Sequence, residues 1–297
     1  MRDAESISVR SPALLWEIEP GSFIISKSGR NRIMKRIISL LLISVLLFSL
    51  GVIGYAENQT LTADLVLERL GATECETQED QVVNGAMRLA EMTVTLDSMS
   101  IETQEEADQL NNILDSLEAI DVPEESFEHK RGVALTRVLD GLVIFQEQFD
   151  RDGRYTDQLN MILESFDTCD DKAETASEQA MNALYHCVIL ASLIAQENCS
   201  TQNMVNQVKK ETSAFQAGDE AAADLSAQFV NGGESLLRML TAIASMRDDG
   251  SYAENIQTIS EDTYAAAEAD DDPMYQLANW LYGCTSMMAV VVWQLEG

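Results

Sequence analysis

After residue 60, apolar residues recur every three or four positions through most of the chain, with polar residues between them. This spacing is typical of amphipathic helices, because it places the apolar side chains on one face. Gly, Pro, Asp and Thr separate successive segments, as is usual where helices end and begin. Runs that alternate apolar and polar residues, which indicate half-buried strands, are few. The pattern predicts an all-α fold.

The same spacing sets approximate limits for five pairs of helices. The expected segments run over about 61–70, 77–99, 103–117, from Pro123 to 149, 155–166, 172–196, 201–215, 220–246, 252–264 and 273–295. Thr103 and Glu106 have the spacing of a capping box, in which each side chain accepts from the other residue's backbone N–H. Asp272 is expected to cap the last helix, with Pro273 at its first position, where the missing N–H costs nothing.

One stretch of the chain occurs twice. Residues 179–187 and 276–284 are identical at five of nine positions, at a shift of 97 residues. Half that distance, a shift of 49, brings the sequence of residues 108–111 onto that of 157–160. A fixed period of this size is typical of repeat proteins. We therefore expect tandem helical hairpins with a period of about 49 residues, forming either a short α-solenoid or a closed helical bundle.

Two of the longer helices contain no charged residue over 179–196 and 273–295. A helix that is apolar all round must be covered on most of its surface. Membrane insertion would also cover it, but Gln276, Asn279 and His186 are poorly suited to lipid. We expect the longer helices to lie inside the array and the shorter, acidic helices outside it.

The region before residue 57 has the parts of a secretory signal. Lys35 and Arg36 precede an uncharged, Leu- and Ile-rich stretch that ends at Gly54-Tyr55-Ala56. A basic start, an apolar middle and small residues at the cleavage site define such signals. We expect cleavage after Ala56, which makes the mature protein secreted or extracytoplasmic. An uncleaved membrane anchor is the alternative, since the stretch could just cross ~30 Å of hydrocarbon.

This assignment divides the chain into three parts. Residues 1–33 fit no targeting pattern, so we interpret them as a non-native or mis-assigned extension and Met34 as the start of translation. Residues 34–56 are the predicted signal peptide. Residues 57–297 are the predicted all-α helical-repeat domain, for which we expect no stable membrane insertion after cleavage.

The predicted mature region is strongly acidic. Residues 57–297 hold 12 Lys and Arg against 46 Asp and Glu. Such a charge repels nucleic-acid phosphates, so we expect no nucleic-acid partner. It favours basic partners or cations, and the acidic runs at 170–171 and 270–272 could attract divalent ions weakly. It also suits a protein hydrated in salty surroundings.

Five cysteines, an odd number, follow the predicted cleavage site, so at least one thiol is unpaired within the monomer. Cys187 and Cys284 are equivalent in the repeated stretch, and we interpret them as small buried thiols. Cys75 and Cys169 are both expected in turns at the same end of their hairpins. They are the candidate pair for a disulfide.

The repeated stretch also supplies the candidate site residues. Three polar residues recur in it, and the two sets are Gln179, Asn182 and Tyr185, and Gln276, Asn279 and Tyr282. Placed inside an array, these groups need hydrogen-bond partners. They therefore form either a structural network used twice or a pair of ligand-binding sites.

Motifs that would indicate catalysis are missing from the sequence. It has no Glu-x-x-His pair, no His-Glu-x-x-His and no paired Cys-x-x-Cys, so we predict no metal site and no cofactor. The acidic turns before Gly153 and Gly250 are similar to calcium loops but lack the first and last ligands of an EF-hand. We predict an exported, non-catalytic protein that binds an unknown, basic protein partner. The alternative is a small-molecule or cation-binding bundle that serves as an extracytoplasmic binding or sensor domain.

Overall fold

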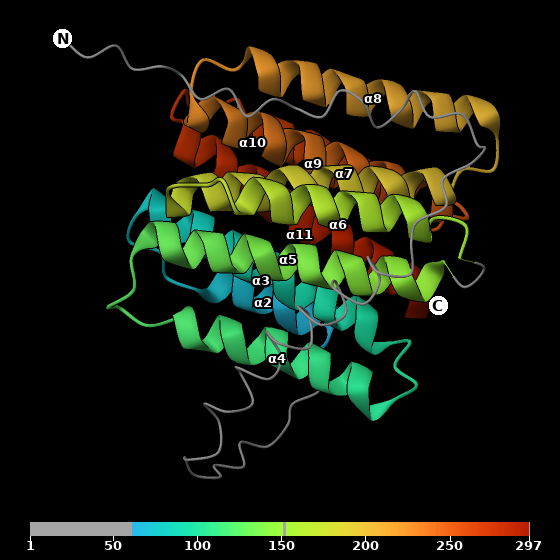
Figure 1. Ribbon diagram of the computed structural model, residues 1–297, viewed down its shortest axis with the longest axis horizontal. Helices are drawn as coiled ribbons and strands as arrows, with labels where there is room; N and C mark the ends of the chain where they lie inside the picture. The colour runs from blue at the N-terminus through green and yellow to red at the C-terminus, as the bar shows by residue number, and fades with distance from the viewer. Residues whose placement is uncertain (1–60, 151–152, 297) are drawn as a thin grey trace. The chain divides into compact units, whose positions relative to one another are not determined.

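The computed structural model describes residues 61–150 and 153–296. This part of the chain contains ten helices and no strand, which confirms the predicted all-α class (Figure 1). The predicted signal peptide and the extension before it lie outside the described residues.

Five outer helices alternate with five inner ones along the chain. The outer helices are α2 (Ala63–Ala72), α4 (Gln104–Ile120), α6 (Thr156–Asp170), α8 (Gln202–Ala221) and α10 (Ala253–Ala267). The inner helices are α3 (Gln78–Ser98), α5 (Phe127–Phe149), α7 (Ala176–Glu197), α9 (Leu225–Arg247) and α11 (Pro273–Glu296). Each lies within a few residues of its expected position, because the hydrophobic spacing is strong in every segment.

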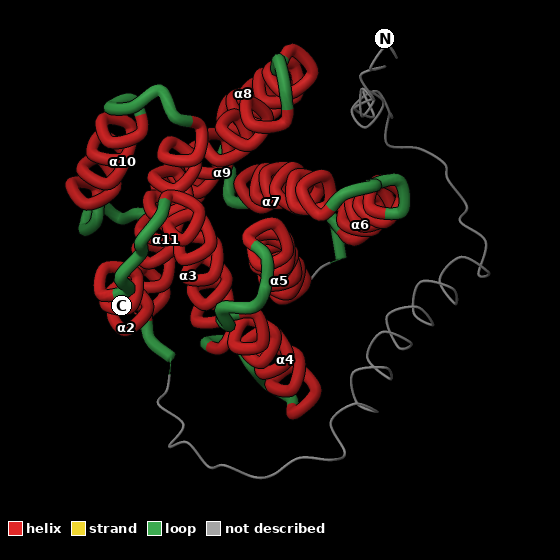
Figure 2. The backbone as a smooth tube through the Cα atoms, turned by 90° about the vertical axis from the view of Figure 1, so that its left-hand side faces the viewer, coloured by secondary structure: helices red, strands yellow, loops and turns green. Residues whose placement is uncertain are grey.

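The inner helices form a closed ring (Figure 2). Each packs against the next in chain order, and α11 returns to pack against α3. Neighbouring inner helices are parallel: Arg131 bonds to Ser177 near the starts of α5 and α7, and Gln146 bonds to Glu197 near their ends. Of the two arrangements predicted, the structure is therefore the closed bundle and not the open solenoid.

The outer helices cover the outward faces of this ring. α2 contacts α3 and α11, α4 contacts α3 and α5, α8 contacts α7 and α9, α10 contacts α9 and α11, and α6 packs on α7. The uncharged stretches of α7 and α11, residues 179–196 and 273–295, are enclosed as a result, and most of their apolar side chains are buried. The expected division into inner long helices and outer acidic helices is observed.

Contacts between neighbouring inner helices keep a nearly constant separation in sequence. The hydrogen-bonded pairs Gln146–Glu197, Asn198–Arg247 and Ala244–Gln294 are 51, 49 and 50 residues apart. These separations are compatible with the period of about 49 residues. The repeat itself stays a prediction, because it concerns the relation between the hairpin sequences.

Acidic side chains help to start several helices. The predicted capping box of Thr103 and Glu106 is present, and two others form at Thr77 and Thr175. The backbone N–H groups of Glu102 and Thr103 bond to the Glu106 carboxylate and lower its pKa. Acidic groups at helix N-termini also interact favourably with the helix dipole. Part of the large negative charge therefore stabilises the helices that carry it.

The ring closes where α11 approaches α3 at Gly85. A Cβ atom on Gly85 would lie 2.9 Å from Leu281 Cβ and 2.9 Å from Tyr282 Cδ1, closer than carbon atoms pack. Two hydrogen bonds cross the same junction: Thr285 donates to the Gly85 carbonyl at 3.4 Å, and Asn84 donates to the Tyr282 hydroxyl at 3.1 Å. Glycine at position 85 therefore sets the spacing of the two helices.

We expect Gly85→Ala to destabilise the protein by ~1–3 kcal/mol, because the added methyl group overpacks the α3–α11 junction. Urea unfolding followed by circular dichroism measures the change. Gly71→Ala in α2 is the matched control, since a Cβ there meets nothing within 4 Å. It should be neutral or slightly stabilising, as alanine favours helix over glycine. Equal effects of the two substitutions would contradict the close approach.

Candidate functional site

The six candidate residues lie in two separate environments. One set is on α7 and the other on α11, which are not neighbours because α9 lies between them in the ring. Gln179 is exposed to solvent, whereas the other five are half-buried. The structure therefore brings no single site together from the two copies of the repeated stretch.

Asn182 connects its inner helix to an outer one. Its side-chain amide donates to the Phe166 carbonyl of α6 at 3.1 Å. Two further asparagines make the same bond on other hairpins: Asn231 of α9 to Phe215 of α8 at 3.1 Å, and Asn84 of α3 to Leu70 of α2 at 3.2 Å. The role of Asn182 is thus structural and occurs three times.

Sequence reasoning missed Asn84 and Asn231 and included Asn279 in their place. The signal was available, because Asn231 follows Asn182 by 49 residues and Asn84 precedes it by twice that distance. Asn279 donates instead to Tyr275, within its own helix, at 2.9 Å. The shift of 49 from Asn231 leads to Trp280, so the shared Gln-x-x-Asn-x-Leu-Tyr pattern did not correspond to a shared contact at Asn279.

Tyr185 and Tyr282 both take part in contacts between hairpins, although their partners differ. Each hydroxyl accepts a hydrogen bond from the next hairpin around the ring, Tyr185 from Gln216 at 3.2 Å and Tyr282 from Asn84 at 3.1 Å. Because α11 is followed by α3 in the closed ring, the hairpin next to Tyr282 is the first one in the chain. Both tyrosines therefore join neighbouring hairpins.

His186 is a buried structural residue. Its ring packs edge-on against Phe166 and Tyr185, and its Nδ1 lies 2.8 Å from the Asn182 carbonyl oxygen. Burial lowers the pKa of His186 to about 4, so the ring is neutral at physiological pH. It is enclosed by α6 and α7 side chains and does not face a groove.

The cysteine interpretation holds for the two inner helices. Cys187 and Cys284 are fully buried, and each thiol points at a carbonyl of the preceding inner helix, Leu135 at 3.7 Å and Gly233 at 3.9 Å. Burial raises the pKa of both thiols. Cys75 and Cys169 are free thiols, so the structure does not contain the bridge predicted between them.

Replacing Asn182 or Asn231, each of which bonds an inner helix to an outer one, should lower the free energy of unfolding. We expect Asn182→Leu and Asn231→Leu each to cost ~1–3 kcal/mol, because each leaves polar groups at a helix–helix contact without a partner. Urea unfolding provides the measurement. Asn279→Leu is the matched control and should cost less than about 0.5 kcal/mol, as its bond lies within one helix. A larger loss for Asn279→Leu than for Asn182→Leu would contradict this assignment.

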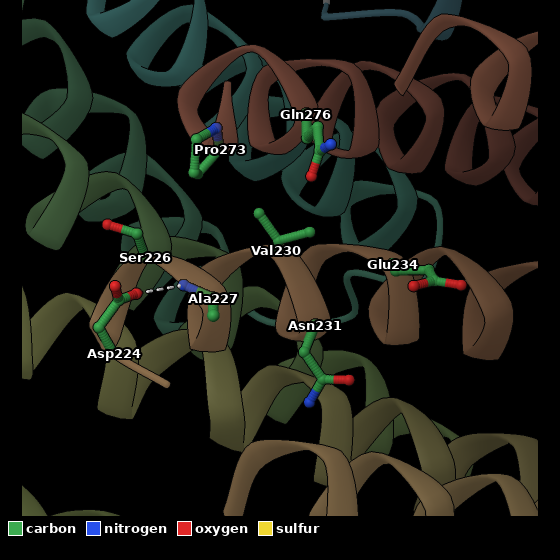
Figure 3. Close-up of a pocket in the computed structure, with 8 residues that line it drawn as sticks. All are labelled: Asp224, Ser226, Ala227, Val230, Asn231, Glu234, Pro273 and Gln276. Atoms are coloured by element: carbon green, nitrogen blue, oxygen red, sulfur yellow. Dashed lines mark hydrogen bonds between the residues drawn. The ribbon is translucent and has the colours of Figure 1, made fainter. Parts of the chain in front are cut away.

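An open groove of about 490 Å³ lies between the first halves of α9 and α11 (Figure 3). Val230 and Gln276 point into it, whereas Asn231 points away toward α8. Asp224 and Glu234 stand at its edges, and the Asp224 carboxylate accepts from the Ala227 backbone N–H at 3.0 Å. Gln276 is a predicted site residue that lines this groove.

A second groove of about 440 Å³ lies between the second half of α9 and the first half of α10. Its lining mixes polar and apolar side chains. Thr241, Ser245 and Asp248 come from the α9 side, and α10 contributes Gln257, Ser260 and Glu261 together with Ala253 and Ile256. Both grooves therefore border α9, and α10 forms one wall of the second.

Arg238 holds the outer helices in place beside the first groove. Its guanidinium bonds to Glu211 of α8, Glu234 of α9 and the Tyr264 hydroxyl of α10. The Tyr264 ring packs edge-on against Trp280 of α11, with centroids 4.9 Å apart. The Arg238 guanidinium thus links α8, α9 and α10 in a region where most charged groups are carboxylates.

The charged groups on the outward surface of α10 and of the loop after it are all carboxylates. Residues 253–272 hold seven Asp and Glu and no Lys or Arg. Six of them are exposed, and within the described part of the chain none of the six takes part in a salt bridge; they are Glu254, Glu261, Asp262, Glu268, Asp270 and Asp271. We call these six residues the α10 face.

The turns that are similar to calcium loops use their carboxylates to start helices. Asp150 accepts from the Tyr155 backbone N–H at 2.8 Å, and Asp248 accepts from that of Tyr252 at 2.9 Å. Gly153 and Gly250 have positive φ angles of 67° and 103°, which glycine adopts without strain. Among residues 61–150 and 153–296, no cluster of three His, Cys, Asp or Glu side chains is arranged to hold a metal ion.

Comparison of the chain with protein-family models, curated proteins and solved structures finds no match. Within the described residues, no helix combines the length and the apolar character needed to cross a membrane.

Proposed function

We propose that this chain is an exported, non-catalytic binding protein whose α10 face binds a basic protein outside the cytoplasm. The observation that carries the proposal is the α10 face itself, six exposed carboxylates without an ion pair beside the two grooves that border α9. Like charges that face solvent without counter-charges attract a complementary surface and raise its rate of association.

The closed ring limits where a partner can bind. An open solenoid offers a concave surface to its partner, whereas here α11 packs on α3 and side chains fill the space inside the ring. A partner must therefore bind from outside, on the outer helices or in a groove between helices such as α9 and α11. α10 is favoured over α4, which is also acidic, because one of the two grooves lies beside it, where side chains of a partner could be seated.

Export is part of the proposal and is supported by the sequence alone. The basic pair Lys35-Arg36, the apolar stretch after it and the small residues before Glu57 have the order of a secretory signal. The alternative function, a small-molecule or cation-binding bundle, has less support. Asn182, Tyr185 and Tyr282 are already engaged in contacts between helices.

Charge reversal on α10 tests the proposal. The full-length tagged protein is used to capture proteins from the extracytoplasmic fraction at physiological salt, and affinity for each purified captured protein is then measured by calorimetry. We expect Glu254→Lys with Glu261→Lys and Asp262→Lys to weaken binding at least about tenfold, because the complementary charges become repulsive.

The matched control reverses three exposed carboxylates of α4, Asp108→Lys, Asp115→Lys and Glu118→Lys, and changes the net charge by the same amount. It should weaken binding less than about twofold at physiological salt, where charges farther apart than ~8 Å are largely screened. Equal losses for both variants would indicate bulk charge attraction and would contradict a site on α10. Circular dichroism of both variants checks that the ring is intact.

A further inference from the structure

The carboxyl group of Asp97, in the last turn of α3, is enclosed without a partner. Its exposed fraction is 0 %, and neither oxygen has a hydrogen-bond partner. Another buried acid on the same helix is treated differently: Glu91 lies between Arg69 and Arg88 and bonds to both. An ionised carboxylate without a partner is strongly disfavoured inside a protein, whereas the protonated form is tolerated.

The face of α3 that carries Asp97 is tightly packed against α5. Asp97 follows Thr93 by one helical turn and so lies on the same face of α3. That face meets α5 at Gly141, where an added Cβ would collide with the Thr93 side chain. One turn further along α5 is Phe145, which is also buried. Little space is therefore left for water to solvate a charge.

Charged groups on the helices packed against α3 do not cause the pKa shift of the Asp97 carboxyl. Burial alone raises the pKa of its carboxyl well above the ordinary value, and no charged group on α2, α4, α5 or α11 contributes. The charged residues of these helices nearest in position to the end of α3 are all acidic, and they are Asp64, Glu105, Glu106, Glu147 and Glu296. Negative charges would in any case oppose ionisation of Asp97.

We propose that Asp97 is a proton-binding switch in the ring: when it is protonated, the carboxyl end of α3 packs closed against α5, and when it is ionised this end of the ring loosens. Three features carry the inference together, namely complete enclosure, two unpartnered oxygens and a position in the helix that closes the ring. The inference does not depend on the proposed binding function.

The direction of the pH effect follows from linkage. The folded protein keeps a proton on Asp97 that the unfolded chain loses above the ordinary Asp pKa of about 4. The stabilisation is therefore fully present below that pH and is lost as the pH rises through the folded-state pKa. Over this window the group alone raises the unfolding equilibrium constant by up to about tenfold per pH unit.

The test compares urea unfolding of the full chain between pH 5 and pH 8 for the natural protein, Asp97→Asn and Asp108→Asn. The amide keeps the shape of the neutral acid but has no proton to lose. In the natural protein, ionisation of Asp97 should raise the unfolding equilibrium constant by up to about tenfold per pH unit, and Asp97→Asn should remove this contribution. Asp108→Asn lies on the exposed face of α4 and should leave the pH dependence unchanged. The same pH dependence in all three proteins would overturn the proposal.

A second measurement needs no variant to fold. Carboxyl carbon NMR of the natural protein labelled in aspartate, assigned through the Asp97 backbone, should show this group titrating at a higher pH than the exposed aspartates. Hydrogen exchange of the amides of Val94 to Ser98, corrected for intrinsic rates, should accelerate as the pH rises through that titration. An Asp97 that titrates together with the exposed aspartates, or exchange that does not change across its titration, would show that the switch does not exist.

Discussion

The contact between the first and last inner helices is the constraint on which the rest of this structure depends. Gly85 lets α11 approach α3 closely, and the Asn84–Tyr282 and Thr285–Gly85 hydrogen bonds fix the register of the two helices. Since these groups lie about 200 residues apart, the junction closes a very long loop and unites the five hairpins around one core. It also removes the free ends that an open array would expose.

Closure explains how so acidic a chain forms a stable core. The uncharged stretches of α7 and α11 are covered by the neighbouring inner helices on both sides and by the outer helices. Most carboxylates lie on the outside of the ring. Some of them cap helix N-termini, where their negative charge interacts favourably with the helix dipole. One cation, Arg238, pairs with two carboxylates, Glu211 of α8 and Glu234 of α9, and also bonds to Tyr264 of α10. Asp97 is an exception to this sorting and is correspondingly sensitive to protonation.

The same arrangement directs the search for function to the outer helices. Polar residues that looked like ligand-binding groups connect helices to one another, and side chains occupy the inside of the ring. The features that remain on the outside are the α10 face, which forms no salt bridge within the described residues, and the two grooves that border α9. A partner that recognises this protein would have to match negative charge and groove shape together, which favours a folded basic surface over a small anion or a nucleic acid.

The sequence by itself determined the number of helices, their approximate limits and several of their caps, because hydrophobic spacing and capping depend on residues a few positions apart. It also indicated which helices lie inside, since an uncharged helix has to be covered. It took Asn279 for the counterpart of Asn182 and missed Asn84 and Asn231. The tertiary structure decided those partners, together with the closure at Gly85 and the isolation of Asp97. Such contacts join segments far apart in the chain, and they exist only once all five hairpins have packed around the same core.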